Sequence, residues 1–194
     1  LNMSFLRRLL GLEKWVQYAV TDWVDAGEMV IGAVTTAPTY PTGGGAVTWN
    51  KRRWRRVGDS MEIVYTFSTN SNSGAAGGSG SYLFPLPPGY SIDPAKWTFG
   101  AASAAGGPGN DICGTGYATH LGGAGEQGAI NIFAHNSTNF YCRVGASDTD
   151  SGGADAYAGN IVSNTTYHMN EASGIRYNFT ACVPIYGWTS KIRG

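Results

Sequence analysis

Glycine and its placement constrain the fold of this 194-residue chain more than any other feature. The chain holds 29 glycines, and charged residues make up only 13% of it. Glycine weakens helices and supplies turns, and here it separates short runs rich in the β-branched and aromatic residues that favour strands. The composition therefore predicts many short strands joined by turns. An aromatic content of 12% argues against a disordered chain.

The length and the charge of the chain limit its domain organisation and the classes of partner that we expect. The length suits one domain with an appendage, or two small domains. The 13 basic and 13 acidic residues cancel, so the surface as a whole is not built to seek nucleic acid, and we expect no nucleic-acid partner. No apolar run approaches the ~20 residues that cross a bilayer, so we expect no membrane partner. Glu13 and Lys14 interrupt the apolar N-terminal stretch, so we expect this stretch to be retained rather than cleaved as a signal peptide.

Three cysteines, Cys113, Cys142 and Cys182, are widely spaced in the sequence. An odd number at such spacing does not make a disulfide framework. Free cysteines suit folding in a reducing cytoplasm, where they act as small apolar residues. One disulfide bridge stays open as an alternative.

The N-terminal residues 1–22 carry the clearest helical pattern. Apolar side chains recur there at the spacing of one helix face, and an isolated helix this short is marginal in water. The face must therefore pack on something, either on its own domain or on another subunit. We expect an anchoring arm, and the side chains that would anchor it are Phe5, Leu6, Leu9, Leu10, Leu12, Trp15 and Val16.

The residues from 23 to 194 read as strands and turns. In Met61–Thr69 apolar and polar residues alternate, as in a half-buried strand, and Gly58–Asp59 predicts a hairpin turn to a strand at Ala46–Val57. Many short strands at this spacing predict an all-β sandwich or barrel. The other expected strands are Met29–Thr36, Ser81–Leu86, Trp97–Ala104, Ile112–His120, Gly128–Ala134, Asn139–Gly145, Asn160–His168 and Gly174–Ile185.

Residues with catalytic or metal-binding chemistry form no motif. The histidines His120, His135 and His168 lie far apart, and metal-protease and nucleophile-elbow motifs are missing. The aspartates of residues 148–155 suit a solvated loop better than a calcium site. No spacing pairs the carboxylates that a glycoside hydrolase would need, which would come from Asp59, Glu62, Asp93 and Asp111. We therefore expect a protein that is not an enzyme, with no catalytic residue, cofactor or metal.

Five basic residues gather within Lys51–Arg56, beside Trp49 and around Trp54. In a strand, Arg53 and Arg55 would point to one face and their neighbours to the other. Arginines on both faces fit a strand between subunits, paired there with carboxylates. The second interpretation of this basic run is a solvated sheet edge. The third is a site for single-stranded nucleic acid, bound by stacking and phosphate contacts. The residues expected at a subunit contact are Arg52, Arg53, Trp54, Arg55, Arg56 and Trp188.

Four segments carry a resemblance to a known family: Thr35–Thr39 (TTAPT), Trp54–Ile63 (WRRVGDSMEI), Tyr82–Asp93 (YLFPLPPGYSID) and Phe179–Trp188 (FTACVPIYGW). In this order and spacing, the chain from about residue 23 to its end resembles structural domains on the particles of tailed bacteriophages. Such domains occur as tail-fibre tips, head fibres and head decorations. The resemblance implies a jelly roll, a homotrimer and a place on the virion surface, and it supplies no catalytic residues.

Together these patterns predict a virion structural protein, most simply a head decoration (cement) or head-fibre protein. It would trimerise through its jelly roll and attach through its N-terminal arm to other virion proteins, the major capsid protein above all. A tail fibre usually needs a shaft sequence, and the chain has none. The alternative is a tail-fibre or tail-tip protein that binds a host surface glycan, with some of its aromatic side chains as a sugar-stacking platform. The candidates for this platform are Tyr82, Tyr90, Trp97, Tyr117, Phe140, Tyr141, Tyr157 and Tyr167. A lytic enzyme is the third hypothesis.

Overall fold

The computed structural model describes residues 20–42, 47–70, 74–99, 111–120, 127–147, 162 and 174–190. Within these ranges the chain forms strands and no helix, so the all-β expectation is confirmed. The helix expected in residues 1–22 and most of the strand expected at Asn160–His168 lie outside them. The strands are β1 (Val24–Asp25), β2 (Gly32–Ala33), β3 (Val47–Val57), β4 (Ser60–Thr69), β5 (Tyr82–Pro85), β6 (Ile112–His120), β7 (Gln127–Asn136), β8 (Asn139–Ser147) and β9 (Ile175–Pro184).

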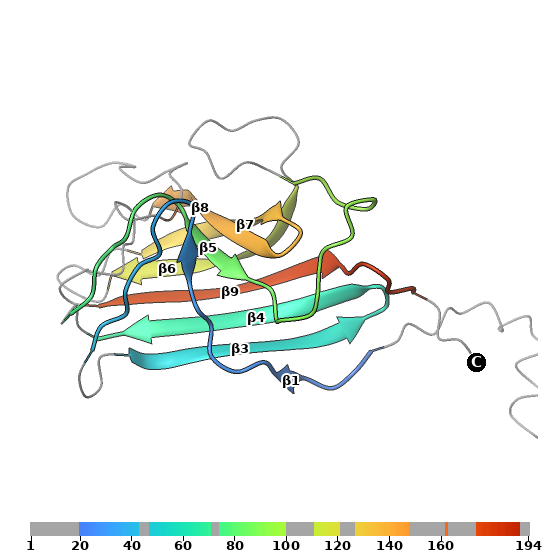
Figure 1. Cartoon of the computed structure of the whole chain (residues 1–194), viewed down its shortest axis with the longest axis horizontal. Helices are drawn as coiled ribbons and strands as arrows, with labels where there is room; N and C mark the ends of the chain where they lie inside the picture. The colour runs from blue at the N-terminus through green and yellow to red at the C-terminus, as the bar shows by residue number, and fades with distance from the viewer. Residues whose placement is uncertain are drawn as a thin grey trace, which may run out of the picture.

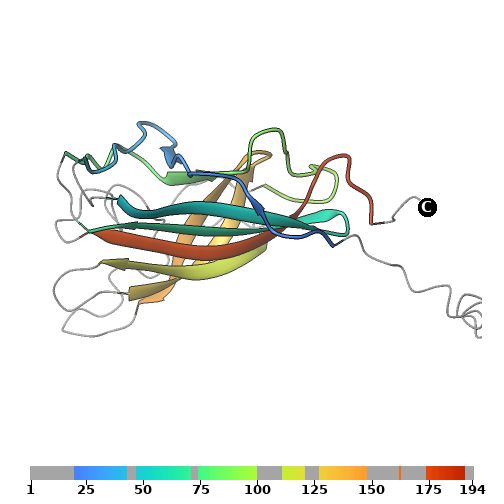
Figure 2. The same cartoon turned by 90° about the horizontal axis from the view of Figure 1, so that it is seen from below.

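The strands form one antiparallel sheet in the order β1-β3-β4-β9-β6-β7-β8-β5-β2. The sheet curls into a half-barrel, and β5 comes to lie opposite β4 and β9 (Figures 1 and 2). The predicted hairpin is confirmed, because β3 and β4 pair up to Val57 and Ser60 across a turn in which Gly58 has φ of 66°. Strand β9 pairs with β4, so two of the segments that carry the resemblance are neighbours in space.

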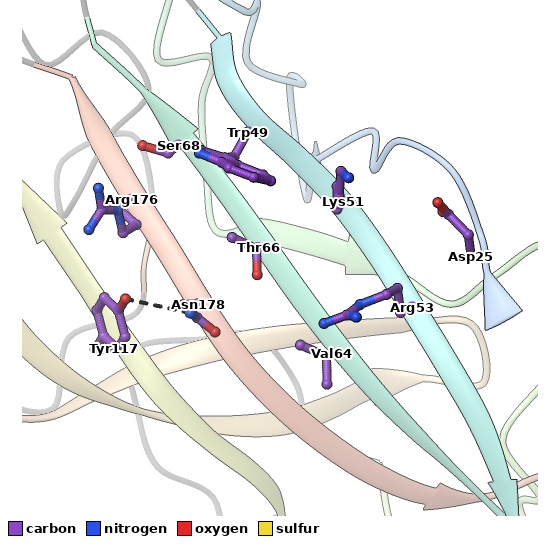
Figure 3. A pocket seen from close by; sticks show the side chains of 10 residues that line it. All are labelled: Asp25, Trp49, Lys51, Arg53, Val64, Thr66, Ser68, Tyr117, Arg176 and Asn178. Carbon is purple, nitrogen blue, oxygen red and sulfur yellow. Dashed lines mark hydrogen bonds between the residues drawn. The ribbon is translucent and has the colours of Figure 1, made fainter. Parts of the chain in front are cut away.

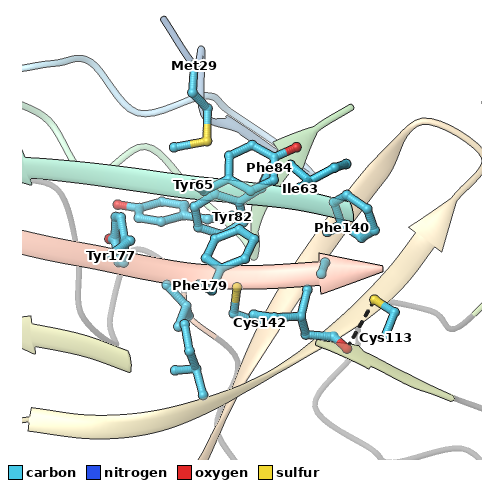
Figure 4. Close-up of a cluster of buried hydrophobic side chains, with 14 of the residues drawn as sticks. Met29, Ile63, Tyr65, Tyr82, Phe84, Cys113, Phe140, Cys142, Tyr177 and Phe179 are labelled. Atoms are coloured by element: carbon cyan, nitrogen blue, oxygen red, sulfur yellow. Dashed lines mark hydrogen bonds between the residues drawn. The ribbon is translucent and has the colours of Figure 1, made fainter. Parts of the chain in front are cut away.

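Aromatic rings fill the space inside the curl (Figure 4). The predicted alternation in Met61–Thr69 is confirmed, because its four odd-numbered apolar side chains up to Phe67 are fully buried. Tyr65 stacks on Phe179 of β9 with ring centroids 4.6 Å apart, and Phe84 of β5 meets Phe179 edge-on at 5.1 Å. These contacts join the two facing parts of the sheet, and large buried rings of this kind dominate core energetics.

Two expected strands differ from the structure: one is shorter than predicted, and the described part of the other is not a strand. In Met29–Thr36 only Gly32–Ala33 is a strand, because side chains take over the backbone hydrogen bonds of the buried residues. Met29 N donates to Asn50 Oδ1 at 2.8 Å, and Ile31 N donates to the Tyr40 hydroxyl at 2.6 Å. The described part of Trp97–Ala104, residues 97–99, is not a strand either and follows a turn at residues 94–96.

A glycine of β6 allows this strand to approach β9 closely. Gly116 stands opposite Phe179, and a Cβ added at Gly116 would lie 2.3 Å from the Phe179 Cβ and 2.1 Å from the Asn178 carbonyl oxygen. No side chain fits at such distances. The close approach of β6 to β9 therefore requires glycine at this position.

Replacing Gly116 by alanine should lower the free energy of unfolding by about 3 kcal/mol, because the added methyl group forces the two strands apart. Gly32→Ala is the matched control, since its Cβ would meet Leu83 at an ordinary 3.8 Å. Urea unfolding followed by far-UV circular dichroism measures both. Equal unfolding midpoints for the two variants would contradict the strand contact described for Gly116.

All three cysteines are free, so the disulfide left open by the sequence does not form. Cys113 and Cys142 are buried, and Cys182 is exposed on β9. Burial raises the pKa of Cys113 to about 12 and the pKa of Cys142 well above its ordinary value. The thiol form, which is unreactive, therefore prevails at both buried positions.

In the native protein at pH 8, one thiol in three should react with Ellman's reagent, and it should be that of Cys182. The other two should react only after unfolding in guanidinium chloride. Partial burial, Glu62 and Asp59 raise the pKa of Cys182, so its reaction should be slower than that of free cysteine. Cys182→Ser should abolish the native reaction, and rapid reaction of a thiol in that variant would show that the core opens readily.

Candidate functional site

The basic run on β3 alternates between the two faces of the sheet, as predicted. Arg52 is 5% exposed and points into the molecule, whereas Lys51 and Arg53 are exposed on the outer face. Arg55 shares that outer face, and Arg56 shares the face of Arg52. The basic run thus places cationic side chains on two separate faces of β3, one directed into the molecule and one directed outward.

Arg52 binds three carbonyl oxygens of its own chain. Its Nη1 donates to Pro85 O and Leu86 O, both at 3.2 Å, and its Nη2 donates to Ala26 O at 3.1 Å. The Tyr65 hydroxyl also donates to Pro85 O, and burial raises the pKa of Tyr65 above its usual range. Arg52 therefore ties β3 to the end of β5 and to the segment that follows β1.

Arg56, Trp54 and Trp188 form a second cluster at one end of β3. Arg56 donates from Nε to Gly58 O and from Nη2 to Thr189 O, both at 2.7 Å, and its guanidinium lies 4.8 Å from the Trp188 ring centroid. Trp54 contacts Tyr90 and Trp188, with ring centroids 4.9 and 5.9 Å away, and these two rings also contact each other at 5.6 Å. This cluster fastens the end of the described chain to β3.

Trp23 covers the arginines of the outer face near the sheet edge. The guanidinium carbons of Arg55 and Arg53 lie 4.8 and 5.8 Å from its ring centroid, and Arg55 also pairs with Glu62 at 2.6 Å. Trp23 itself is 39% exposed, and Val24 beside it is 41% exposed. The edge at β1 therefore combines apolar and cationic surface.

A hollow of about 440 Å³ lies on the outer face of β3, β4, β9 and β6. We call it the outer-face groove, and Figure 3 shows the side chains that line it. The strand register brings them into cross-strand rows, in which Lys51 is followed by Thr66, Asn178 and Tyr117. Its lining residues are Asp25, Trp49, Lys51, Arg53, Val64, Thr66, Ser68, Tyr117, Arg176 and Asn178.

The outer-face groove is cationic, although the chain as a whole has no net charge. Lys51, Arg53 and Arg176 line it, against one carboxylate, Asp25. Among the described residues, none of these three cations has a carboxylate oxygen within 4.0 Å. Charged side chains that face a common hollow without ion-pair partners are candidates for binding an anion.

The four carboxylates considered for hydrolysis have three different surroundings. Lys96 Nζ lies 3.0 Å from Asp59 Oδ2 and 3.7 Å from Asp93 Oδ2, and its hydrogen bond holds the pKa of Asp59 below the ordinary value. Glu62 pairs with Arg55 instead, and Asp111 is exposed just before β6. In the described residues, no three side chains of His, Cys, Asp or Glu gather as metal ligands.

Several predicted sites fall outside the described ranges. They are the anchoring side chains Phe5, Leu6, Leu9, Leu10, Leu12, Trp15 and Val16, the aspartates of residues 148–155, and His168. Across the parts of the chain that are described, no helix has the length and apolar character to cross a membrane.

The sequence reasoning missed Trp49, Arg176 and Asn178 as members of one site, and it considered Tyr117 only as one of several candidates for a sugar-stacking platform. Trp49 is in phase with Lys51 and Arg53 along β3, and this spacing was a usable signal. The other three come from β9 and β6, and no local pattern shows that these strands lie beside β4. Tyr82, by contrast, was considered for a sugar-stacking platform and is fully buried.

Searches of protein-family models, curated proteins and solved structures found no match to this chain. Its function is therefore inferred from the geometry and the sequence patterns of its own residues.

Exchanging Arg52 for glutamine should lower the free energy of unfolding by about 3 kcal/mol, because buried carbonyl oxygens lose their donors. Arg53→Gln removes the same charge from the exposed face and should change stability by less than about 0.5 kcal/mol. Chemical denaturation of both variants, followed by tryptophan fluorescence, makes the comparison. If both variants matched the parent protein, Arg52 would not hold the segments together.

Proposed function

We propose that this chain is a non-enzymatic structural protein of a tailed-bacteriophage particle, a head decoration (cement) or head-fibre subunit. In this proposal the rolled sheet is a jelly roll that forms a homotrimer on the virion surface. The N-terminal arm attaches it to other virion proteins, the major capsid protein in the first place. The resemblance of four segments supports the class of protein, and the arrangement of the chain ends supports the mode of attachment.

The observation that carries the attachment is that both ends of the described chain lie at one pole of the molecule (Figure 1). Val20 pairs with Val57 at the end of β3, and Thr21 N donates to Arg56 O at 3.1 Å. The same arginine binds Thr189 O through its side chain. An arm made of residues 1–19 would leave from this pole, and the rest of the domain would project away from the particle.

The sheet edge beside this pole suits a subunit contact. Residues 20–27 cover the β3 edge from Val57 to Arg52 with backbone pairs and hydrogen bonds. Exposed apolar side chains on such an edge segment favour association. Val20, Trp23 and Val24 are 58%, 39% and 41% exposed there, next to Arg53 and Arg55. Arg52 and Trp54 would support such a contact from inside the subunit.

A tail-fibre or tail-tip protein that binds a host surface glycan is the second candidate. The outer-face groove favours it, since an exposed tryptophan and three cations without carboxylate partners among the described residues face the same hollow. A groove of this kind is compatible with a place on the head as well. The two candidates therefore differ in location and not in the fold they require.

Removing residues 1–19 should leave a folded trimer that no longer binds particles, because the arm and the β1 edge serve separate contacts in this proposal. Light scattering after gel filtration measures the trimer, and cosedimentation with virions of the parent phage measures attachment. The matched control is the full-length chain in both assays.

Retained particle binding by the truncated protein would refute the anchoring role, and a monomeric full-length chain would refute the trimer. Labelling of intact virions with antibodies against residues 46–194 tests the location. Label spread over the head is the expected result, and label confined to the tail would favour the second candidate.

A further inference from the structure

We infer that the outer-face groove binds a carboxylated polysaccharide, with the sugar ring on Trp49 and the carboxylate on the arginines of β3 and β9. The inference goes beyond the virion role and stands without it, because the groove requires neither the trimer nor the arm.

Trp49 provides the platform. Its side chain is 54% exposed on a long strand of the sheet, whereas the largest aromatic rings of the core are fully buried. An indole presents a broad apolar surface with little conformational freedom, which makes tryptophan effective at binding surfaces. Lys51 Nζ lies 5.4 Å from the ring centroid. A sugar whose C–H face stacks on Trp49 would therefore have an ammonium group within reach.

The cations provide the charge for the carboxylate. Arg55 and Lys96 have carboxylate partners at 2.6 and 3.0 Å, but Lys51, Arg53 and Arg176 have none within 4.0 Å among the described residues. A guanidinium group binds a carboxylate through two parallel hydrogen bonds, and an ordered strand positions it for this. Arg53 and Arg176 approach the groove from β3 and β9, on either side of β4 (Figure 3).

The remaining lining favours a sugar over nucleic acid. Asp25, Thr66 and Asn178 offer oxygen and nitrogen atoms to hydroxyl groups, which both donate and accept hydrogen bonds. A phosphodiester backbone has no donor for the Asp25 carboxylate, which would repel it. Three cations also neutralise few phosphates, and nucleic-acid affinity grows with the number of phosphates neutralised.

The groove lies away from the pole where the chain ends meet. Trp49 precedes Val57 by eight residues of β3, which corresponds to ~26 Å of extended strand. Attachment at the pole would therefore leave Trp49 and Arg176 accessible to a polysaccharide in solution or on a cell surface.

The test measures binding of the full-length chain to three carboxylated probes by isothermal titration calorimetry: oligogalacturonate, hyaluronan and α2,8-linked sialic acid oligosaccharides. Methyl-esterified oligogalacturonate is the matched uncharged probe, and a dT20 oligonucleotide is the nucleic-acid probe. The variants are Trp49→Ala and Arg176→Gln, with Lys96→Gln as the control that removes one charge outside the groove. Circular dichroism and light scattering of each variant verify the fold and the oligomeric state.

At least one carboxylated probe should bind, and its methyl ester, where tested, should bind at least tenfold more weakly. Trp49→Ala and Arg176→Gln should each weaken binding about tenfold, and Lys96→Gln should change it less than twofold. The inference fails if none of the three probes binds at 1 mM, if dT20 binds more tightly, or if the groove variants bind like the parent protein. It also fails if either groove variant dissociates an oligomer, since the groove would then be a contact between copies. Particle attachment through the arm is measured separately, so either proposal can fail alone.

Discussion

Phe179 lies at the centre of the molecule, stacked on Tyr65 and met edge-on by Phe84. The three rings come from β9, β4 and β5, and they hold the two facing parts of the curled sheet together. Beside these rings, β6 approaches β9 so closely that only glycine fits opposite Phe179. The interior thus combines large rings on three strands with glycine on a fourth.

The central packing also explains why one arginine of the basic run is buried. The curl brings the carbonyl groups of Pro85 and Leu86 over the inner face of β3 without strand partners there. Buried carbonyl groups need donors, and the long side chain of Arg52 supplies them from β3. The neighbours of Arg52 along the strand point outward and have no such role. On β3, the inward side chain therefore stabilises the fold, and the side chains beside it are available for binding at the surface.

Local patterns predicted most strands and the face to which their side chains point. Period-two alternation decides both within a strand, as it did for Met61–Thr69 and for the arginines of β3. Alternation does not show which strands become neighbours, so the row from Lys51 through Thr66 and Asn178 to Tyr117 could not be assembled from the sequence. The strand at β2 was predicted too long for a related reason, because distant polar side chains satisfy the backbone around it.

The position of the chain ends has a consequence for how this domain can be combined with others. Val20 and Thr189 both contact the last residues of β3, so the polypeptide enters and leaves at the same place. A domain with adjacent ends can be inserted into a loop of an unrelated protein without separating the two halves of its host. The same fold can therefore be transferred between proteins as a unit, with its outer face kept in the same orientation relative to the two chain ends.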